Sequence, residues 1–262
     1  MVPSVPASVL IPVVVVASLI PLAGFLTAGL GGRAAGVEHW ARLGLWVAVG
    51  LLLWGALDCG LDALKIGWGK PYRLTPLFLA MAWALPQVVA VLGVRHSPRL
   101  RAALTHRSGL WRLTSIQVAR SLGLVFLILL GQHKLPGLFA YPAAWGDVAV
   151  GVAAPVAMWA TWFRYEELFR PGSSWRRFFI GFNLIGLADH VNAVFLGTGA
   201  FPHMFFGVHP TTAIFAGLPM VLFPIFMVPF ADLAHLICLD VIRQPSAALR
   251  PSRRRVPALT RG

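Results

Sequence analysis

The segment RFFIGFNLIGLADHVNAVFLG, residues 177–197, decides the fold class of this chain. It is long and apolar enough to cross a bilayer, yet its interior holds Asn183, Asp189, His190 and Asn192. An ionised side chain in the hydrocarbon layer costs several kcal/mol unless it finds a partner or water. The segment therefore predicts a helix that packs among other membrane helices around a polar interior.

The rest of the chain has the same apolar character. Of its 262 residues 58% are hydrophobic and 12% are charged, which excludes a soluble domain. We predict an all-α, polytopic membrane protein: a bundle of seven transmembrane helices in residues 1–242, followed by a basic, disordered tail in residues 243–262. The predicted spans cover residues 9–32, 43–64, 76–94, 113–132, 142–163, 177–197 and 212–239.

The basic residues indicate an orientation. Seventeen of the 22 Lys and Arg residues fall in the first, third and fifth connections and in the tail, which predicts an outside N-terminus and a cytoplasmic C-terminus. Lys65, Lys70 and Arg73 run against this bias. The net charge of +13 is then explained by topology and by anionic lipid at the cytoplasmic face, and no compact basic domain indicates nucleic acid. An excess of Arg over Lys and many Ala and Gly residues indicate a GC-rich bacterial genome, so we predict that the membrane is a bacterial inner membrane.

Depth arithmetic groups the intramembrane polar residues into two layers. At about 1.5 Å of rise per residue, Asp58, Asp147, Asp189 and Asn192 share a layer slightly outside the midplane, with His190 at the same height but at a different azimuth. These residues belong to spans two, five and six. They predict a polar cavity between those spans that opens outward, with Asp147 and Asp189 as its leading ion- or substrate-binding groups.

A second polar layer is expected nearer the cytoplasm. Arg120 and Asn183 come out about 10 Å above the inner surface, with Gln117 and Asp232 lower. Asp232 and His235 are three residues apart and share one helix face. An arginine this deep should face the bundle and find a carboxylate, so the sequence predicts an ion pair between Arg120 and Asp232.

Both layers allow a structural and a functional interpretation. Buried polar groups often bond one another and fix helix packing. The functional interpretation is a transporter- or channel-like protein that handles a proton, a cation or a small polar solute. No P-loop, GxSxG, HExxH or dinucleotide motif indicates an enzyme, and the seventh span lacks the lysine of a retinal protein.

Two alternatives remain open at this point. A redox subunit would bind haem b or quinone through His190 or His235, although matched histidines on facing spans are missing. A metal site is conceivable on the outer side, but no spacing fixes a ligand pair among Asp58, Asp62, His133, Asp147, His190, His203 and His209. The chain is also a candidate accessory subunit of an oligomer or of a larger membrane complex.

Prolines mark the last span. Pro219, Pro224 and Pro229 recur at intervals of five inside residues 212–239. Each removes a backbone donor and clashes with the preceding turn. We therefore predict a bent or broken helix whose freed carbonyl groups find other partners.

Overall fold

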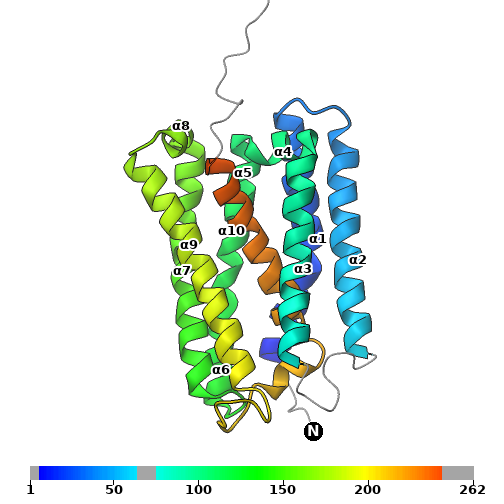
Figure 1. The fold of residues 1–262 in the computed structure, drawn as a ribbon, viewed down its shortest axis with the longest axis vertical. Coiled ribbons are helices and arrows are strands. Elements are labelled where there is room, and N and C mark those ends of the chain that lie inside the picture. The colour runs from blue at the N-terminus through cyan, green and yellow to red at the C-terminus, as the bar shows by residue number, and fades with distance from the viewer. Residues whose placement is uncertain (1–5, 64–74, 244–262) are drawn as a thin grey trace, which may run out of the picture.

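The computed structural model describes residues 6–63 and 75–243, and every element within them is helical. Long helices run side by side, and shorter ones cover one end of the bundle (Figure 1). The helices are α1 (Ala7–Ala34), α2 (Trp40–Ala63), α3 (Thr75–His96), α4 (Pro98–Thr105), α5 (Arg107–Ser115), η2 (Ile116–Gly123), α6 (Leu124–Gly131), α7 (Gly137–Phe163), α8 (Tyr165–Phe169), α9 (Ser174–Gly199), η3 (Ala213–Ala216), η4 (Phe223–Met227) and α10 (Val228–Arg243).

The helices have the character of membrane spans. Within the described residues, six stretches are long and apolar enough to cross a bilayer: Ala7–Ala34, Trp40–Leu61, Arg107–Gly131, Gly137–Phe163, Ser174–Gly199 and Phe223–Arg243. Large apolar side chains cover the outside of the bundle, among them Trp46, Leu53 and Val152, each at least 66% exposed. Such a surface suits lipid and not water. The fold is that of a helical, multi-pass membrane protein.

The fourth predicted span is one continuous helical segment made of three elements. α5, η2 and α6 follow one another without a break from Arg107 to Gly131, and the middle eight residues form a 3₁₀ helix. A 3₁₀ helix rises about 2.0 Å per residue instead of about 1.5 Å and is seldom this long. The stretch carries Gln117 and Arg120, so both lie at a height that uniform α-helical geometry does not give.

The seventh span is broken, as its prolines predicted. Residues 212–222 contain only the short 3₁₀ helix η3, a π-helical turn covers Phe223–Met227, and regular α-helix begins at Val228. The stretch Phe223–Arg243 is the most enclosed of the six, with 78% of its apolar window buried. α10 is therefore the central helix of the bundle, and it runs obliquely between the α7–α9 pair and the α1–α3 group (Figure 1).

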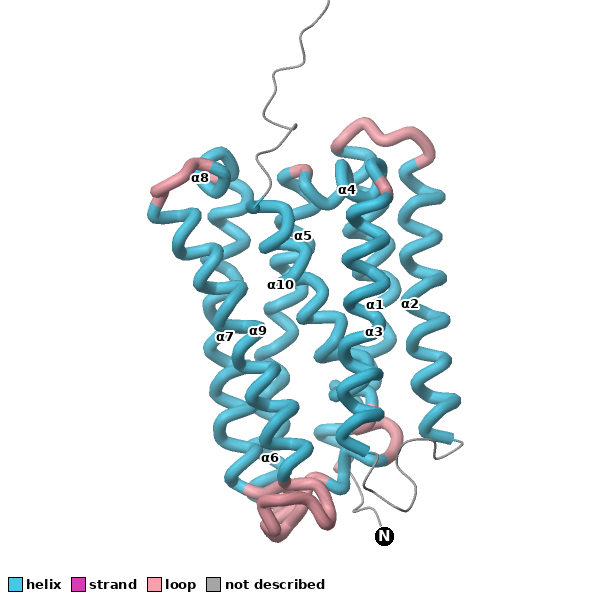
Figure 2. Tube along the Cα trace, viewed as in Figure 1, coloured by secondary structure: helices cyan, strands magenta, loops and turns pink. Residues whose placement is uncertain are grey.

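The connections divide between the two ends of the bundle (Figure 2). The α1–α2 connection, α4, α8 and the end of α10 lie at one end, and the α6–α7 connection and the loop after α9 lie at the other. The first end carries the arginine-rich segments at 33–42, 95–112 and 164–177. Residues 64–74, with Lys65, Lys70 and Arg73, fall outside the described residues, as do the residues from 244 onward.

Candidate functional site

Arg120 lies at the centre of a polar network inside the bundle. Its side chain is 4% exposed, and its Nε donates a hydrogen bond of 2.7 Å to Oδ1 of Asp147 on α7. Its Nη2 donates to Oδ2 of Asp189 on α9. Its Nη1 donates to the carbonyl oxygen of Gly186 at 3.0 Å. One guanidinium therefore joins η2, α7 and α9 through charge-assisted bonds, which are stronger than neutral ones.

His190 extends the network from α9 to α10. Its Nδ1 lies 2.7 Å from Oδ1 of Asp232, and its Nε2 lies 3.5 Å from Oδ1 of Asp147. The other oxygen of Asp232, a fully buried residue, accepts a hydrogen bond of 2.7 Å from the indole Nε1 of Trp83 on α3. An imidazole thus stands between two carboxylates, where it is able to exchange a proton with either.

A second buried histidine borders Arg120 from the other side. Nε2 of His235 lies 3.4 Å from Nη1 of Arg120, and its Nδ1 lies 2.9 Å from Oδ1 of Asn183. Asn183 donates in turn to the carbonyl of Phe179, 2.7 Å away, so its amide orientation is fixed by its own helix. Because arginine only donates, the nitrogen of His235 that faces Arg120 is the acceptor of a neutral imidazole.

Gln117 ties η2 to the central helix. Its Nε2 donates a hydrogen bond of 3.0 Å to the carbonyl oxygen of Ala231, which lies two residues beyond Pro229. Its Oε1 is buried without a partner among the described residues. Gln117 therefore secures the register of η2 against α10, next to the network and not within it.

Two glycines allow the helices to come this close. A methyl group on Gly186 would overlap the imidazole of His235, and a methyl group on Gly146 would overlap the carboxylate of Asp189. Both glycines lie in the middle of a long helix, where glycine is otherwise unfavourable by about 0.5–1 kcal/mol relative to alanine. Close approach of α7, α9 and α10 at the network accounts for glycine at these positions.

The network contains more acid than base. Three carboxylates, from Asp147, Asp189 and Asp232, face a single guanidinium and two imidazoles. With all acids ionised and both histidines neutral, the cluster would carry two uncompensated negative charges. Burying them costs several kcal/mol per ion. Up to two protons, shared between His190 and the carboxylates, bring the cluster toward neutrality.

Two small cavities reach the network. One of about 190 Å³ lies between α1, η2 and α10 and is lined by Arg120, Asp147 and His190. The other, of about 70 Å³, is lined by Trp83, Asp147 and His190 and extends to Thr198 and Thr212 beside the loop after α9. Asp147 and His190 therefore border both spaces, and each cavity has room for water.

The structure joins the two predicted layers into one site. Arg120, Asp147, Asp189, His190, Asp232, His235 and Asn183 form one connected set of hydrogen bonds and ion pairs. Arg120 pairs with Asp147 and Asp189 instead of Asp232, because its long side chain and the stretched 3₁₀ segment carry its charge into the outer layer. Asp232 pairs with His190.

Two predicted residues lie outside this site. Asn192 is exposed on the outer face of α9. Asp58 is buried at 3% exposure, but it lies on α2, which packs chiefly against α1, and it lines neither cavity of the network. The cavities therefore involve α1, α7, α9 and α10 and not the second span. Equal depth places residues in a layer but does not say which helices are neighbours.

Sequence reasoning missed Trp83. Tryptophans in membrane proteins commonly lie near span ends, but Trp83 lies in the interior of α3 and donates to Asp232. Its position in the sequence could have indicated this role, because Trp83 lies eight residues after the start of the helix and not at either end.

The two histidines of the network, His190 and His235, are poorly placed to ligate iron or zinc. Both ring nitrogens of His190 face carboxylates, and both of His235 face Arg120 and Asn183. In the described part of the chain, no three His, Cys, Asp or Glu side chains converge on a point that would hold a metal ion. The side chain of Asp62, one of the conceivable ligands, falls outside that part.

Comparison with known families places this arrangement in context. The family model described as domain of unknown function DUF8737 matches residues 76–243. The chain belongs to this family. The DUF8737 region begins in α3 and ends with α10, so it contains every residue of the Arg120 network, whereas α1 and α2 precede it. No curated protein and no solved structure matches the chain.

Proposed function

We propose that this protein is a transporter- or channel-like protein of the bacterial inner membrane, in which the Arg120 network handles a proton as a small polar solute or cation crosses the bilayer. The observation that carries the proposal is the excess of carboxylate over fixed positive charge in a buried cluster. A cluster that needs protons to become neutral changes its charge when those protons leave.

The geometry supplies a path for such a proton. His190 bridges Asp147 and Asp232, and Asp147 is joined through Arg120 to Asp189. Ionisable chains of this kind are typical of proton relays in membrane proteins. Because Asp147 and His190 border both cavities, a proton that enters from one cavity reaches the other by exchange between these two side chains.

Arg120 is assigned a structural and electrostatic role. Each of its three nitrogens already donates to an acceptor of the network, so the guanidinium has little capacity left to bind an anionic substrate. Its fixed charge holds Asp147 and Asp189 together. The exchangeable groups are then the carboxylates and His190.

We further propose seven spans, in which α3 is counted together with the six stretches given above, and an outside N-terminus. α3 has 22 residues and packs against α10 inside the bundle. The gathering of the arginine-rich segments at one end of the molecule supports a cytoplasmic position for that end (Figure 1).

Proteoliposomes test the proposed function directly. Purified protein is reconstituted with a pH-sensitive dye inside the vesicles, and a potassium gradient with valinomycin imposes a membrane potential. We expect proton entry with the wild-type protein and its loss in Asp189→Asn, because the amide cannot exchange a proton at this position. Asp240→Asn is the matched control, since Asp240 forms an ion pair with the exposed Arg95 and lies outside the network. Equal flux in Asp189→Asn and wild type, with both proteins folded, would contradict the proposal.

A further inference from the structure

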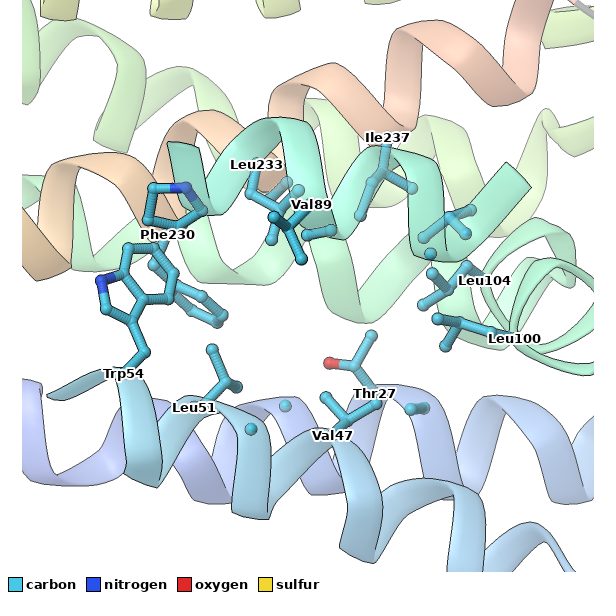
Figure 3. A pocket seen from close by; sticks show the side chains of 18 of the residues that line it. Thr27, Val47, Leu51, Trp54, Val89, Leu100, Leu104, Phe230, Leu233 and Ile237 are labelled. Carbon is cyan, nitrogen blue, oxygen red and sulfur yellow. The ribbon is translucent and has the colours of Figure 1, made fainter. Parts of the chain in front are cut away.

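A cavity larger than the two that reach the polar network lies apart from that network. It has a volume of about 530 Å³ and lies between α1 and α2 on one side and α3, α4, α5 and α10 on the other (Figure 3). Its wall is almost entirely apolar, and Leu51, Val89, Leu233 and Ile237 point into it. Cavities of this size and polarity are typical of sites for apolar ligands.

The cavity opens sideways toward lipid. Leu53 and Leu57 on α2 and Leu85 and Val89 on α3 belong to its wall and are 59–66% exposed. α2 packs chiefly on α1, and α3 packs on α10, so the two helices border a gap and do not close it. A molecule in the surrounding bilayer therefore has direct access to the cavity without passing through water.

One end of the cavity meets the basic end of the bundle. Leu100 and Leu104 of α4 close it there, opposite Trp54 and Phe230 (Figure 3). Arg99 and Arg101 flank Leu100 in α4. The end of α1, with Arg33, and the start of α2, with Arg42, lie at the same end (Figure 1). The apolar cavity thus reaches the end of the bundle that carries several arginines.

We propose that the cavity is a binding site for the acyl chain of an anionic phospholipid, whose headgroup lies among the arginines at this end. The apolar wall accepts the chain, the gap between α2 and α3 admits it from the bilayer, and the arginine-rich end attracts the phosphate. Basic sites between membrane helices on the cytoplasmic side are typical places for anionic headgroups. This site shares no polar residue of the Arg120 network and does not depend on the proposed proton function.

Two glycines allow a test that preserves the fold. A Cβ atom at Gly50 on α2 or at Gly93 on α3 would meet nothing within 4 Å, and both glycines line the cavity. The double substitution Gly50→Leu with Gly93→Leu should narrow the cavity, because the first side-chain atom at each position meets no neighbour. Gly60→Leu is the matched control, because Gly60 is on α2, has the same freedom and does not line the cavity.

The measurement is native mass spectrometry of delipidated protein titrated with phosphatidylglycerol or phosphatidylcholine in a mild detergent. We expect the wild type and Gly60→Leu to bind phosphatidylglycerol more tightly than phosphatidylcholine, and the double variant to lose about tenfold or more in affinity. Quenching of Trp54 fluorescence by phosphatidylglycerol with brominated chains, taken as the difference between wild type and Trp54→Phe, tests the same site without filling it.

Three outcomes would overturn the proposal. The first is undiminished phosphatidylglycerol binding by the double variant together with no quenching of Trp54. The second is recovery of an isoprenoid quinone or a neutral lipid, and no phospholipid, from the purified wild type. The third is a dimer that the double variant abolishes, which would make a second copy of the chain the occupant of the gap.

Discussion

The Nδ1 atom of His190 lies 2.7 Å from Oδ1 of Asp232, and both side chains are almost completely enclosed by the bundle. The two residues come from α9 and from the helix that follows the broken stretch of the seventh span. Their contact joins the central helix to the α7–α9 pair at the height where Arg120 holds Asp147 and Asp189. Several consequences of this arrangement are open to measurement.

Removal of the Arg120 charge should destabilise the fold strongly. Arg120→Met leaves two largely enclosed carboxylates, with side chains 13% and 11% exposed, without their cation, and breaking a buried ion pair in this way costs about 3–5 kcal/mol. Arg164→Met is the comparison, because Arg164 pairs with Glu167 at the surface with 48% of its side chain exposed, and such pairs are worth about 1 kcal/mol or less. Thermal unfolding in detergent checks both. Similar losses in the two variants would show that Arg120 does not organise the interior.

Close helix approach at the network predicts opposite effects for two glycines of α9. Gly186→Ala should destabilise the protein and disturb the network, because the added methyl group would overlap His235. Gly181→Ala should be neutral or stabilising by about 0.5–1 kcal/mol, since a Cβ there meets nothing within 4 Å and alanine favours the helix. The melting temperatures of the two variants, each compared with that of the wild type, test this prediction. A stabilising Gly186→Ala would mean that α9 and α10 are not packed as described.

The connection between α4 and α5 should show a pH dependence of its own. Nδ1 of His106 accepts a hydrogen bond from the backbone N–H of Ser108 and caps α5, while burial, and secondarily the charge of Arg107, lowers the pKa of this imidazole below its usual value. The unfolded chain therefore binds a proton more readily than the folded one. Stability should fall as the pH drops from about 7 through the ordinary histidine pKa of about 6.5 toward the lowered folded value.

His106→Asn isolates this effect. Asparagine is a good N-cap residue and does not titrate, so the variant should retain α5 and lose this part of the pH dependence. Thermal unfolding of both proteins across the same pH series provides the comparison. Identical pH profiles for wild type and variant would assign the dependence to other groups.

Much of the fold was predictable because hydrophobic segments long enough to cross a bilayer are defined by composition. The predicted spans agree with α1, α2, α3, α7 and α9 to within a few residues. The prolines of the last span predicted that its helix is broken. The polar residues of the sixth span indicated a polar interior. Asp189 and His190, quoted from that segment, both belong to the network.

The partners of Arg120 were not predictable from depth. A uniform rise per residue placed Arg120 in the inner layer, whereas η2 is stretched and the side chain reaches outward to Asp147 and Asp189. Depth also carries no information on lateral neighbours. A uniform rise per residue gives Asp58 nearly the same depth as Asp189. Asp58 nevertheless belongs to α2, which lies at the margin of the bundle.

The central claim is that the network around Arg120 takes up and releases protons, and infrared difference spectroscopy of the purified protein tests it most directly. Spectra recorded between about pH 4 and pH 9 in H₂O and D₂O report protonated carboxyl groups through their C=O stretch. We predict a titrating carboxyl band that is lost or shifted in Asp147→Asn and Asp189→Asn and altered in His190→Gln, but unchanged in Asp240→Asn. A titration that is the same in all four variants as in the wild type would contradict the account.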